Sequence, residues 1–286
     1  MIAAAFAIAL AAFEADEVAF AVTNGGLHRS TNGGRAWRAV DRGLDSEAIQ
    51  AIAFSPAFAD DGVVLAASED LGIFRSSDRG GSWKEASNGL DNRSINAVWF
   101  SSGYAADRTI YAGSAGNGVY RSTDGGTSWQ AVVGDGIETT AVMSLVSDTT
   151  GATVIAGSHQ GGLWRSTDHG ATWGRASEGV AARSMSVIAV SPAFADDQTL
   201  YAAGVEDGVL RSRDAGLTWE AVSGVLPGSQ VLSLSLAPDH ATSGTLHTVL
   251  AEGMYRSDDR GDTWHPVIIE GDAPRIASYA SNTDGD

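Results

Sequence analysis

The chain has 286 residues, enough for one large domain or two of average size. It carries 35 acidic and 18 basic side chains, a formal charge of −17, which argues against a nucleic-acid backbone or an anionic membrane as the main partner because both require a basic face. The lack of cysteine excludes disulfides, thiolate metal sites and cysteine nucleophiles. Its 35 glycines and eight tryptophans indicate many short strands joined by tight turns.

The apolar stretch at residues 2–13 has two interpretations. It resembles a signal-peptide core, although no basic residue precedes it as a secretory signal requires. Alternatively, residues 6–10 form a strand of a first repeat, because residues 16–23 match residues 61–68 in pattern. We favour the strand and expect no membrane span, since a membrane helix needs about 20 apolar residues. An extracytoplasmic or secreted location is favoured, without a clear signal peptide.

A sequence repeat runs along the whole chain. Each of six copies begins with Arg-Ser and ends in tryptophan, and successive copies are 44–46 residues apart. A period in the forties is typical of propellers and other repeat arrays. The repeated tryptophans are Trp37, Trp83, Trp129, Trp173, Trp219 and Trp264.

Each repeat reads as four short strands. In the second repeat, the apolar runs at residues 48–55, 63–68, 73–77 and 82–87 are separated by turns rich in glycine, proline and aspartate. Four strands per unit around an axis give a β-propeller. We therefore predict an all-β, six-bladed β-propeller with four antiparallel strands per blade, forming a single domain over residues 1–286. The approximate repeats are 2–46, 47–92, 93–138, 139–182, 183–228 and 229–272.

The C-terminal residues 275–282 resemble a first strand without the three that should follow. We favour a closing strand that completes the first blade. The alternative is a seven-bladed ring in which this segment belongs to a partial blade.

The repeated motif resembles the Asp-box, or bacterial neuraminidase repeat, written S-x-D-x-G-x-[ST]-W. Five copies match it fully, and the first has Asn32 and Ala36 instead of aspartate and a hydroxyl residue. The resemblance implies a β-propeller in which each box caps the hairpin between the third and fourth strands, opposite the usual binding face. Sialidases, xyloglucan-cleaving glycosidases, sortilin-type receptors and photosystem II stability/assembly factor-like proteins carry such repeats, so it implies no single function.

The box residues are interpreted as structural. Their aspartates are expected to accept hydrogen bonds from turn N–H groups, and their tryptophans to be buried between blades. These aspartates are Asp78, Asp124, Asp168, Asp214 and Asp259. The arginine before each box is expected to lie along its blade and pair locally, rather than to join an anion-binding ring. These arginines are Arg29, Arg75, Arg121, Arg165, Arg211 and Arg256.

A ligand site is expected at the channel mouth, on the face opposite the boxes. Arg93 and Arg183 both stand two residues before a first strand, and Arg275 joins them if the tail closes the first blade. Three arginines about 120° apart in a six-bladed ring would converge on a carboxylate, sulfate or acidic sugar, with Glu138 alongside. Solvated surface arginines are the favoured alternative. Trp99, on a predicted inner strand, either stacks on a sugar or, as we favour, fills a gap between blades.

The favoured function is non-catalytic binding or scaffolding, with a glycan, peptide or protein partner at the mouth. The alternative is a carbohydrate-active enzyme, a glycoside hydrolase or lyase, that uses two mouth carboxylates. No catalytic residue is assigned; the candidate acids are Glu69, Asp91, Glu138 and Glu206. We expect a monomer with no cofactor and no metal, because the six histidines show no metal-ligand spacing. The aligned acids before second strands, which could suggest calcium, are interpreted as turn residues; they are Asp16, Asp61, Asp107 and Asp197.

Overall fold

The structure is a computed structural model that describes residues 8–10, 18–23, 26–40, 42–44, 48–176, 184–224, 226 and 230–268. The chain divides into two compact units, Met1–Val133 and Gly134–Asp286, which are described separately as unit 1 and unit 2. The single domain expected over the whole chain stays a prediction.

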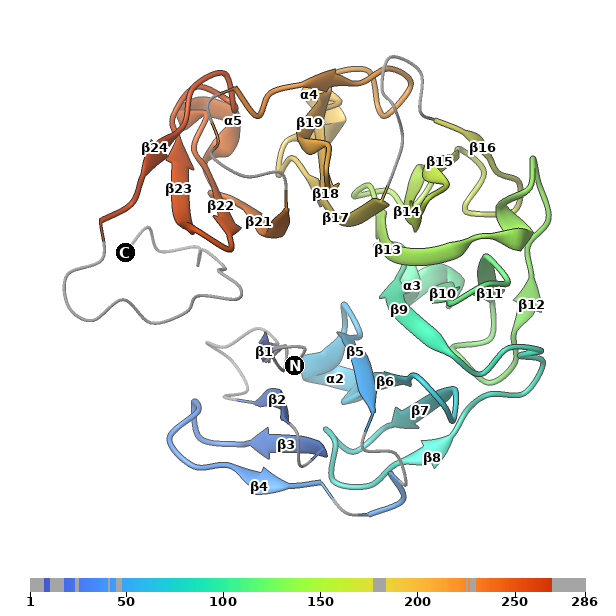
Figure 1. Cartoon of the computed structure of the whole chain (residues 1–286). Helices are drawn as coiled ribbons and strands as arrows, with labels where there is room; N and C mark the ends of the chain where they lie inside the picture. The colour runs from blue at the N-terminus through green and yellow to red at the C-terminus, as the bar shows by residue number, and fades with distance from the viewer. Residues whose placement is uncertain are drawn as a thin grey trace. The chain divides into compact units, whose positions relative to one another are not determined.

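Unit 1 contains three four-stranded antiparallel sheets, each with its strands in chain order (Figure 1). In every sheet the first strand pairs with the second, the second with the third and the third with the fourth. The first sheet consists of β1 (Ile8–Leu10), β2 (Ala19–Thr23), β3 (Gly26–Ser30) and β4 (Arg38–Ala39); the second of β5 (Ile49–Phe54), β6 (Val64–Ser68), β7 (Ile73–Ser76) and β8 (Lys84–Glu85); the third of β9 (Ile95–Phe100), β10 (Ile110–Ser114), β11 (Val119–Ser122) and β12 (Gln130–Ala131).

Unit 2 repeats this arrangement three more times. The fourth sheet consists of β13 (Ala141–Ser147), β14 (Val154–His159), β15 (Gly162–Ser166) and β16 (Gly174–Arg175); the fifth of β17 (Ser184–Val190), β18 (Leu200–Val205), β19 (Gly208–Ser212) and β20 (Glu220–Ala221); the sixth of β21 (Val231–Leu236), β22 (Leu246–Leu250), β23 (Gly253–Ser257) and β24 (His265–Pro266).

The described residues confirm the predicted fold, all-β with six blades of four antiparallel strands. The favoured strand near the N-terminus is also found, because β1 pairs with β2 from Ile8 opposite Ala21 to Leu10 opposite Ala19. The fourth strands are shorter than predicted: only Lys84 and Glu85 of residues 82–87 pair in β8, because residues 82 and 83 belong to the box turn. The predicted closing strand at residues 275–282 lies outside the described residues and stays a prediction.

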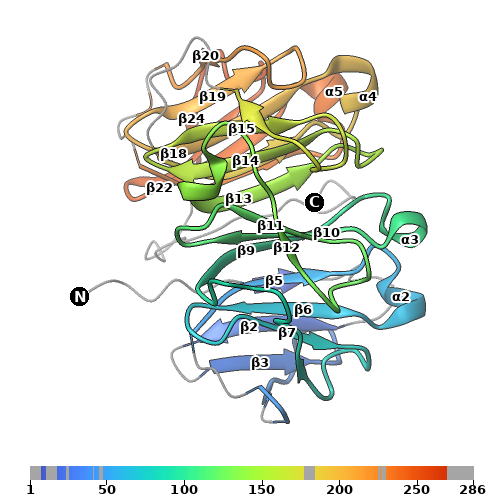
Figure 2. The same cartoon turned by 90° about the vertical axis from the view of Figure 1, so that its right-hand side faces the viewer.

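Short helices stand between the first and second strands, where the sequence indicated only turns. They are α2 (Phe58–Asp61), α3 (Tyr104–Asp107), α4 (Phe194–Asp197) and α5 (His240–Ser243). At α2, Asp61 accepts hydrogen bonds from the Ser55 hydroxyl (2.7 Å) and the Val63 amide (2.8 Å), so this acid closes the turn. Asp197 accepts the same two kinds of bond from Ser191 and Thr199. Figure 2 shows α2 and α3 at one end of the sheets of unit 1.

The core of each unit lies between neighbouring sheets. Second strands such as β6 are buried on both faces, which explains their uninterrupted apolar sequence. In unit 1, the ring of Trp83 meets the edge of Phe20 in the preceding sheet at a centroid distance of 5.9 Å. In unit 2, Trp264 packs with Val222 and Val231. Among the described residues, no helix is both long and apolar enough to cross a membrane.

Candidate functional site

The Asp-box turns lie between the third and fourth strands of each sheet. In the second sheet, Asp78 Oδ1 accepts hydrogen bonds from the Ser82 amide (2.8 Å) and the Ser76 hydroxyl (2.7 Å), and Oδ2 accepts one from the Ser82 hydroxyl (2.7 Å). Equivalent bonds hold the other four box aspartates, Asp124, Asp168, Asp214 and Asp259. These bonds engage the carboxylates within their own turns.

The same bonds shift the titration of the box carboxylates. Partial burial alone would raise the pKa of Asp78, but hydrogen bonds from Ser82 and Ser76 outweigh it and lower the pKa to about 2. The pKa of Asp168 is lowered to about 2 in the same way, with Thr172 and Ser166 as donors. A carboxylate stabilised by its own turn in this way is a poor proton donor near neutral pH.

The box tryptophans divide into two groups. Five are buried, each at most 4% exposed, whereas Trp37 of the first box is 37% exposed. Two indoles donate hydrogen bonds to the preceding sheet, Trp129 to the Ala86 carbonyl (2.8 Å) and Trp264 to the Val222 carbonyl (2.7 Å). The indole therefore joins sheets by a polar bond as well as by apolar packing.

The opposite end of each sheet carries the turn between the second and third strands, and the first strand begins there. We call this the mouth end, and the end with the Asp-box turn the box end. Near the mouth end, the register of five first strands slips by one residue. A β-bulge re-aims the extra side chain. The bulged residues are Gln50, Asn96, Met143, Ser186 and Leu232.

The bulges present different chemistry in the two units. In unit 1, Gln50 Nε2 donates a hydrogen bond to Glu69 Oε2 at 3.0 Å. In unit 2, the side chains of Met143 and Leu232 are 38% and 40% exposed, although both lie on the first strands of their sheets. Sequence reasoning missed these residues because a one-residue surplus is visible only in the pairing register. The one available signal was the pair of adjacent large apolar residues that opens β13 and β21.

A serine–histidine contact also lies at the mouth end of unit 2. Ser184 Oγ, at the start of β17, is 2.8 Å from His159 Nδ1, at the end of β14. A nucleophile of this type requires a third group that orients the histidine. Among the described residues, no carboxylate accepts a hydrogen bond from His159, and the contact is exposed to solvent.

The candidate anion site depends on Arg93, Arg183 and Arg275. Arg93 Nη1 lies 2.6 Å from Glu85 Oε1 and 3.4 Å from the Leu71 carbonyl, so its guanidinium reaches the fourth strand and a turn of the second sheet. The predicted convergence of the three arginines stays a prediction, because residues 183 and 275 lie outside the described residues.

Glu138 and Trp99 lie in different elements. Glu138 belongs to the short 3₁₀ helix η1 (Ile137–Thr139), where backbone N–H groups, including that of Gly134 at 3.2 Å, lower its pKa below the ordinary carboxyl value. Trp99 lies on β9 opposite Tyr111 and is 36% exposed. Both interpretations of Trp99, stacking on a sugar and the favoured filling of a gap between blades, stay predictions.

No group of three or more potential metal ligands gathers among the residues that the structure describes.

The comparisons with known proteins agree with the repeat and the fold. A model of the BNR-Asp box repeat matches residues 73–86, and a model of the BNR/Asp-box repeat matches residues 120–131 and 255–266. A comparison with curated proteins gives no match.

Several solved structures are similar to this chain. An ancestral GH74 enzyme is 23% identical with a TM-score of 0.74, over 93% of this chain and 39% of that one. The GH74 xyloglucanase from Xanthomonas campestris is 20% identical with a TM-score of 0.64, over 88% of this chain and 44% of that one. YCF48 from Cyanidioschyzon merolae is 17% identical with a TM-score of 0.65, over 91% of this chain and 84% of that one.

At these identities the likeness concerns the fold alone, and the chain spans about two fifths of the length of the ancestral GH74 chain. The predicted resemblance to the Asp-box repeat is confirmed by the repeat models. The chain therefore carries BNR/Asp-box repeats, and its six four-stranded sheets have the β-propeller fold.

Proposed function

We propose that this chain is a non-catalytic binding propeller that holds a glycan, peptide or protein partner at the mouth ends of its first strands. The observation that carries the proposal is the exposure of Met143 and Leu232, at 38% and 40%, on strands that are otherwise partly or fully buried. Bulges aim both side chains out of the regular strand pattern. Single exposed apolar side chains are ordinary, whereas those that act together as a patch mark a recognition surface, so the proposal requires Met143 and Leu232 to contribute jointly.

The titration of Glu138 also favours binding over hydrolysis. A glycosidase needs a carboxylic acid whose pKa is raised, so that it can protonate a leaving group. The mouth candidate Glu138 has a lowered pKa instead, because backbone N–H groups stabilise its charged form. Another candidate, Glu69, accepts a hydrogen bond from Gln50.

A carbohydrate-active enzyme is the second candidate. It is supported by the likeness of the fold to GH74 enzymes, among them a xyloglucanase. Such an activity would need two carboxyl groups about 5–10 Å apart at the mouth. The two candidates therefore differ in one measurable outcome, the release of new reducing ends.

The test applies the whole chain to arrays of glycans and peptides, with one readout for binding and one for reducing ends. The double variant Met143→Ser/Leu232→Ser is compared with Leu217→Ser, a matched change at a side chain that is 55% exposed but lies in a box turn. We expect the double variant to weaken binding at least tenfold and the control to leave it unchanged. Equal losses in both variants would refute the mouth-end site, and new reducing ends would establish the enzyme instead.

A further inference from the structure

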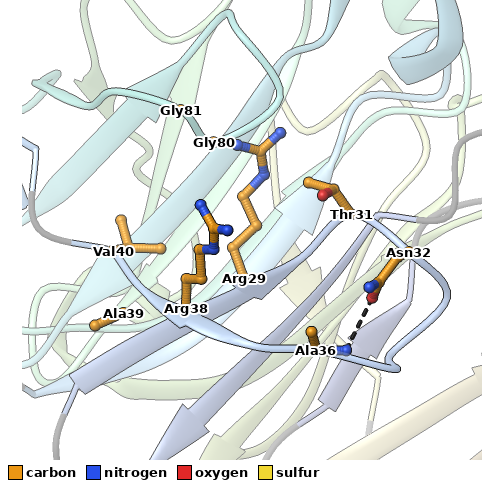
Figure 3. Close-up of a pocket in the computed structure, with 9 residues that line it drawn as sticks. All are labelled: Arg29, Thr31, Asn32, Ala36, Arg38, Ala39, Val40, Gly80 and Gly81. Atoms are coloured by element: carbon orange, nitrogen blue, oxygen red, sulfur yellow. Dashed lines mark hydrogen bonds between the residues drawn. The ribbon is translucent and has the colours of Figure 1, made fainter.

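A polar groove lies at the box end of unit 1, between the first and second sheets. Its volume is about 340 Å³, and its lining includes Arg29, Arg38, Gly80 and Gly81. Figure 3 shows the side chains of Arg29 and Arg38 extending side by side towards Gly80. The groove belongs to a different part of the molecule from the mouth-end residues, so it does not depend on the function proposed for them.

The two arginines form an unfavourable pair in isolation. Arg29 on β3 is directly opposite Arg38 on β4, and like charges at directly opposite positions repel. Within the described part of the chain, neither guanidinium has an ion-pair partner, and Arg29 Nε is buried without a hydrogen-bond partner. Burial and the nearby Arg79 lower the pKa of Arg29, and Asp78 only partly opposes this. The local charge is therefore positive and incompletely neutralised.

The fifth sheet shows how the same position is neutralised elsewhere. Arg211 stands before its box as Arg29 does, and its side chain is only 4% exposed. Its Nη2 lies 2.8 Å from Glu220 Oε1 and 2.9 Å from Asp262 Oδ1. Burial alone would lower the pKa of Arg211, but these two carboxylates raise it.

Strand register and the box motif show which residues of unit 1 hold the positions equivalent to these two carboxylates. Glu220 is directly opposite Arg211, as Arg38 is opposite Arg29. Asp262 follows the box glycine of the sixth repeat, as Gly81 follows that of the second. Unit 1 therefore has a second cation and a bare glycine where the fifth and sixth sheets supply two carboxylates, and the groove occupies the space that results.

We infer that this groove binds a carboxylate of another molecule, held between the guanidiniums of Arg29 and Arg38. Guanidinium groups match a carboxylate with two parallel hydrogen bonds, and an anion between two cations removes their repulsion. The ligand is a small acid, such as an acidic sugar or an acidic amino-acid derivative. The related groove of the second sheet is less suited, because Glu85 already lines it beside Arg75 and Lys84.

The test is calorimetric titration of the whole chain with sodium glucuronate at low salt, with glucose as the neutral control. A parallel titration with N-acetylaspartate separates an acidic sugar from an acidic amino-acid derivative as the preferred source of the carboxylate. We expect the acids to bind and glucose not to bind. Arg38→Gln should weaken binding at least tenfold, and Arg213→Gln, which removes an exposed arginine in unit 2, should leave it unchanged.

The sharpest variant is Arg38→Glu, which places a carboxylate opposite Arg29 as Glu220 lies opposite Arg211. It should abolish binding of the acids and raise the melting temperature, because Arg29 gains an internal partner. Unchanged binding in Arg38→Glu or Arg38→Gln, or binding of glucose equal to that of glucuronate, would overturn the inference. Circular dichroism verifies that the variants fold. If Arg38→Glu does not fold, the binding measured for Arg38→Gln decides whether the inference holds.

Discussion

Trp129 donates an indole hydrogen bond to the carbonyl of Ala86, 2.8 Å away in the preceding sheet of unit 1. The bond lies at the edge of a cluster that also contains Leu90, Ile95 and Tyr120. In the second, third, fifth and sixth repeats the tryptophan lies between its own sheet and the preceding one, so a local motif of a few residues acts as an inter-sheet contact. The stability of the unit therefore depends on residues that lie far from the mouth end.

Trp129→Ala should lower the free energy of unfolding by about 3–5 kcal/mol, the usual cost of truncating a buried aromatic residue. Trp37→Ala is the matched control, because Trp37 holds the same position in its box but is 37% exposed. We expect the control to cost about 1 kcal/mol or less. Urea denaturation followed by far-ultraviolet circular dichroism measures both, and equal losses would contradict the role assigned to burial.

The lowered pKa values of the box aspartates lead us to expect a loss of stability in acid. The pKa of Asp78 and that of Asp168 are lowered to about 2 in the folded chain, from an ordinary value near 3.8. A depressed folded pKa contributes stability that is present above the unfolded pKa and is lost as the pH falls towards the folded pKa. The free energy of unfolding should therefore fall between about pH 5 and pH 2, by roughly 1 kcal/mol for each carboxylate after solvent screening is allowed for.

Asp78→Asn should flatten this pH dependence, because the amide keeps an acceptor for the turn but does not titrate. Asp60→Asn, at an exposed position of α2, is the control and should leave the slope unchanged. Unfolding curves collected at intervals between pH 6 and pH 2 provide the comparison. An identical slope in wild type and Asp78→Asn would show that the box carboxylate does not link stability to pH.

The first box offers a change that should stabilise the chain. Asn32 Oδ1 accepts a bond from the Ala36 amide at 2.9 Å, so the turn forms without the hydroxyl of a complete box. The double substitution Asn32→Asp/Ala36→Thr restores the bond that Thr172 donates to Asp168 at 2.6 Å in the fourth sheet. We expect a gain of about 0.5–1.5 kcal/mol, measured by thermal denaturation. Each single substitution should give less than half of the gain if the two groups act together.

The sequence repeat made the architecture predictable, whereas the side chains that meet at the candidate site could be identified only from the structure. Serine, glycine and tryptophan at fixed spacing identified six hairpins, and apolar runs between them indicated four strands per unit. The bulges at Met143 and Leu232 escaped prediction because a bulge depends on how one strand is aligned with its neighbour. The contact between Arg93 and Glu85 was not predicted for a related reason. Arg93 follows the second sheet in the chain, and its side chain reaches back to β8, the fourth strand of that sheet. Sequence spacing predicts elements, but it does not predict which side chains meet across them.

The ion pairs of Arg211 and Arg93 allow a final comparison within one fold. Arg211 is 4% exposed and contacts Glu220, whereas Arg93 is 49% exposed and contacts Glu85. Glu220→Gln should lower the free energy of unfolding by about 1–3 kcal/mol, because it weakens the neutralisation of a buried cation. Glu85→Gln removes an exposed pair and should cost about 1 kcal/mol at most. Urea denaturation at low and at high salt measures both, and only the cost of Glu85→Gln should disappear at high salt, since salt screens exposed charges far more than buried ones. A loss of equal size and salt sensitivity at the two sites would show that burial does not govern the strength of the arginine contacts in this fold.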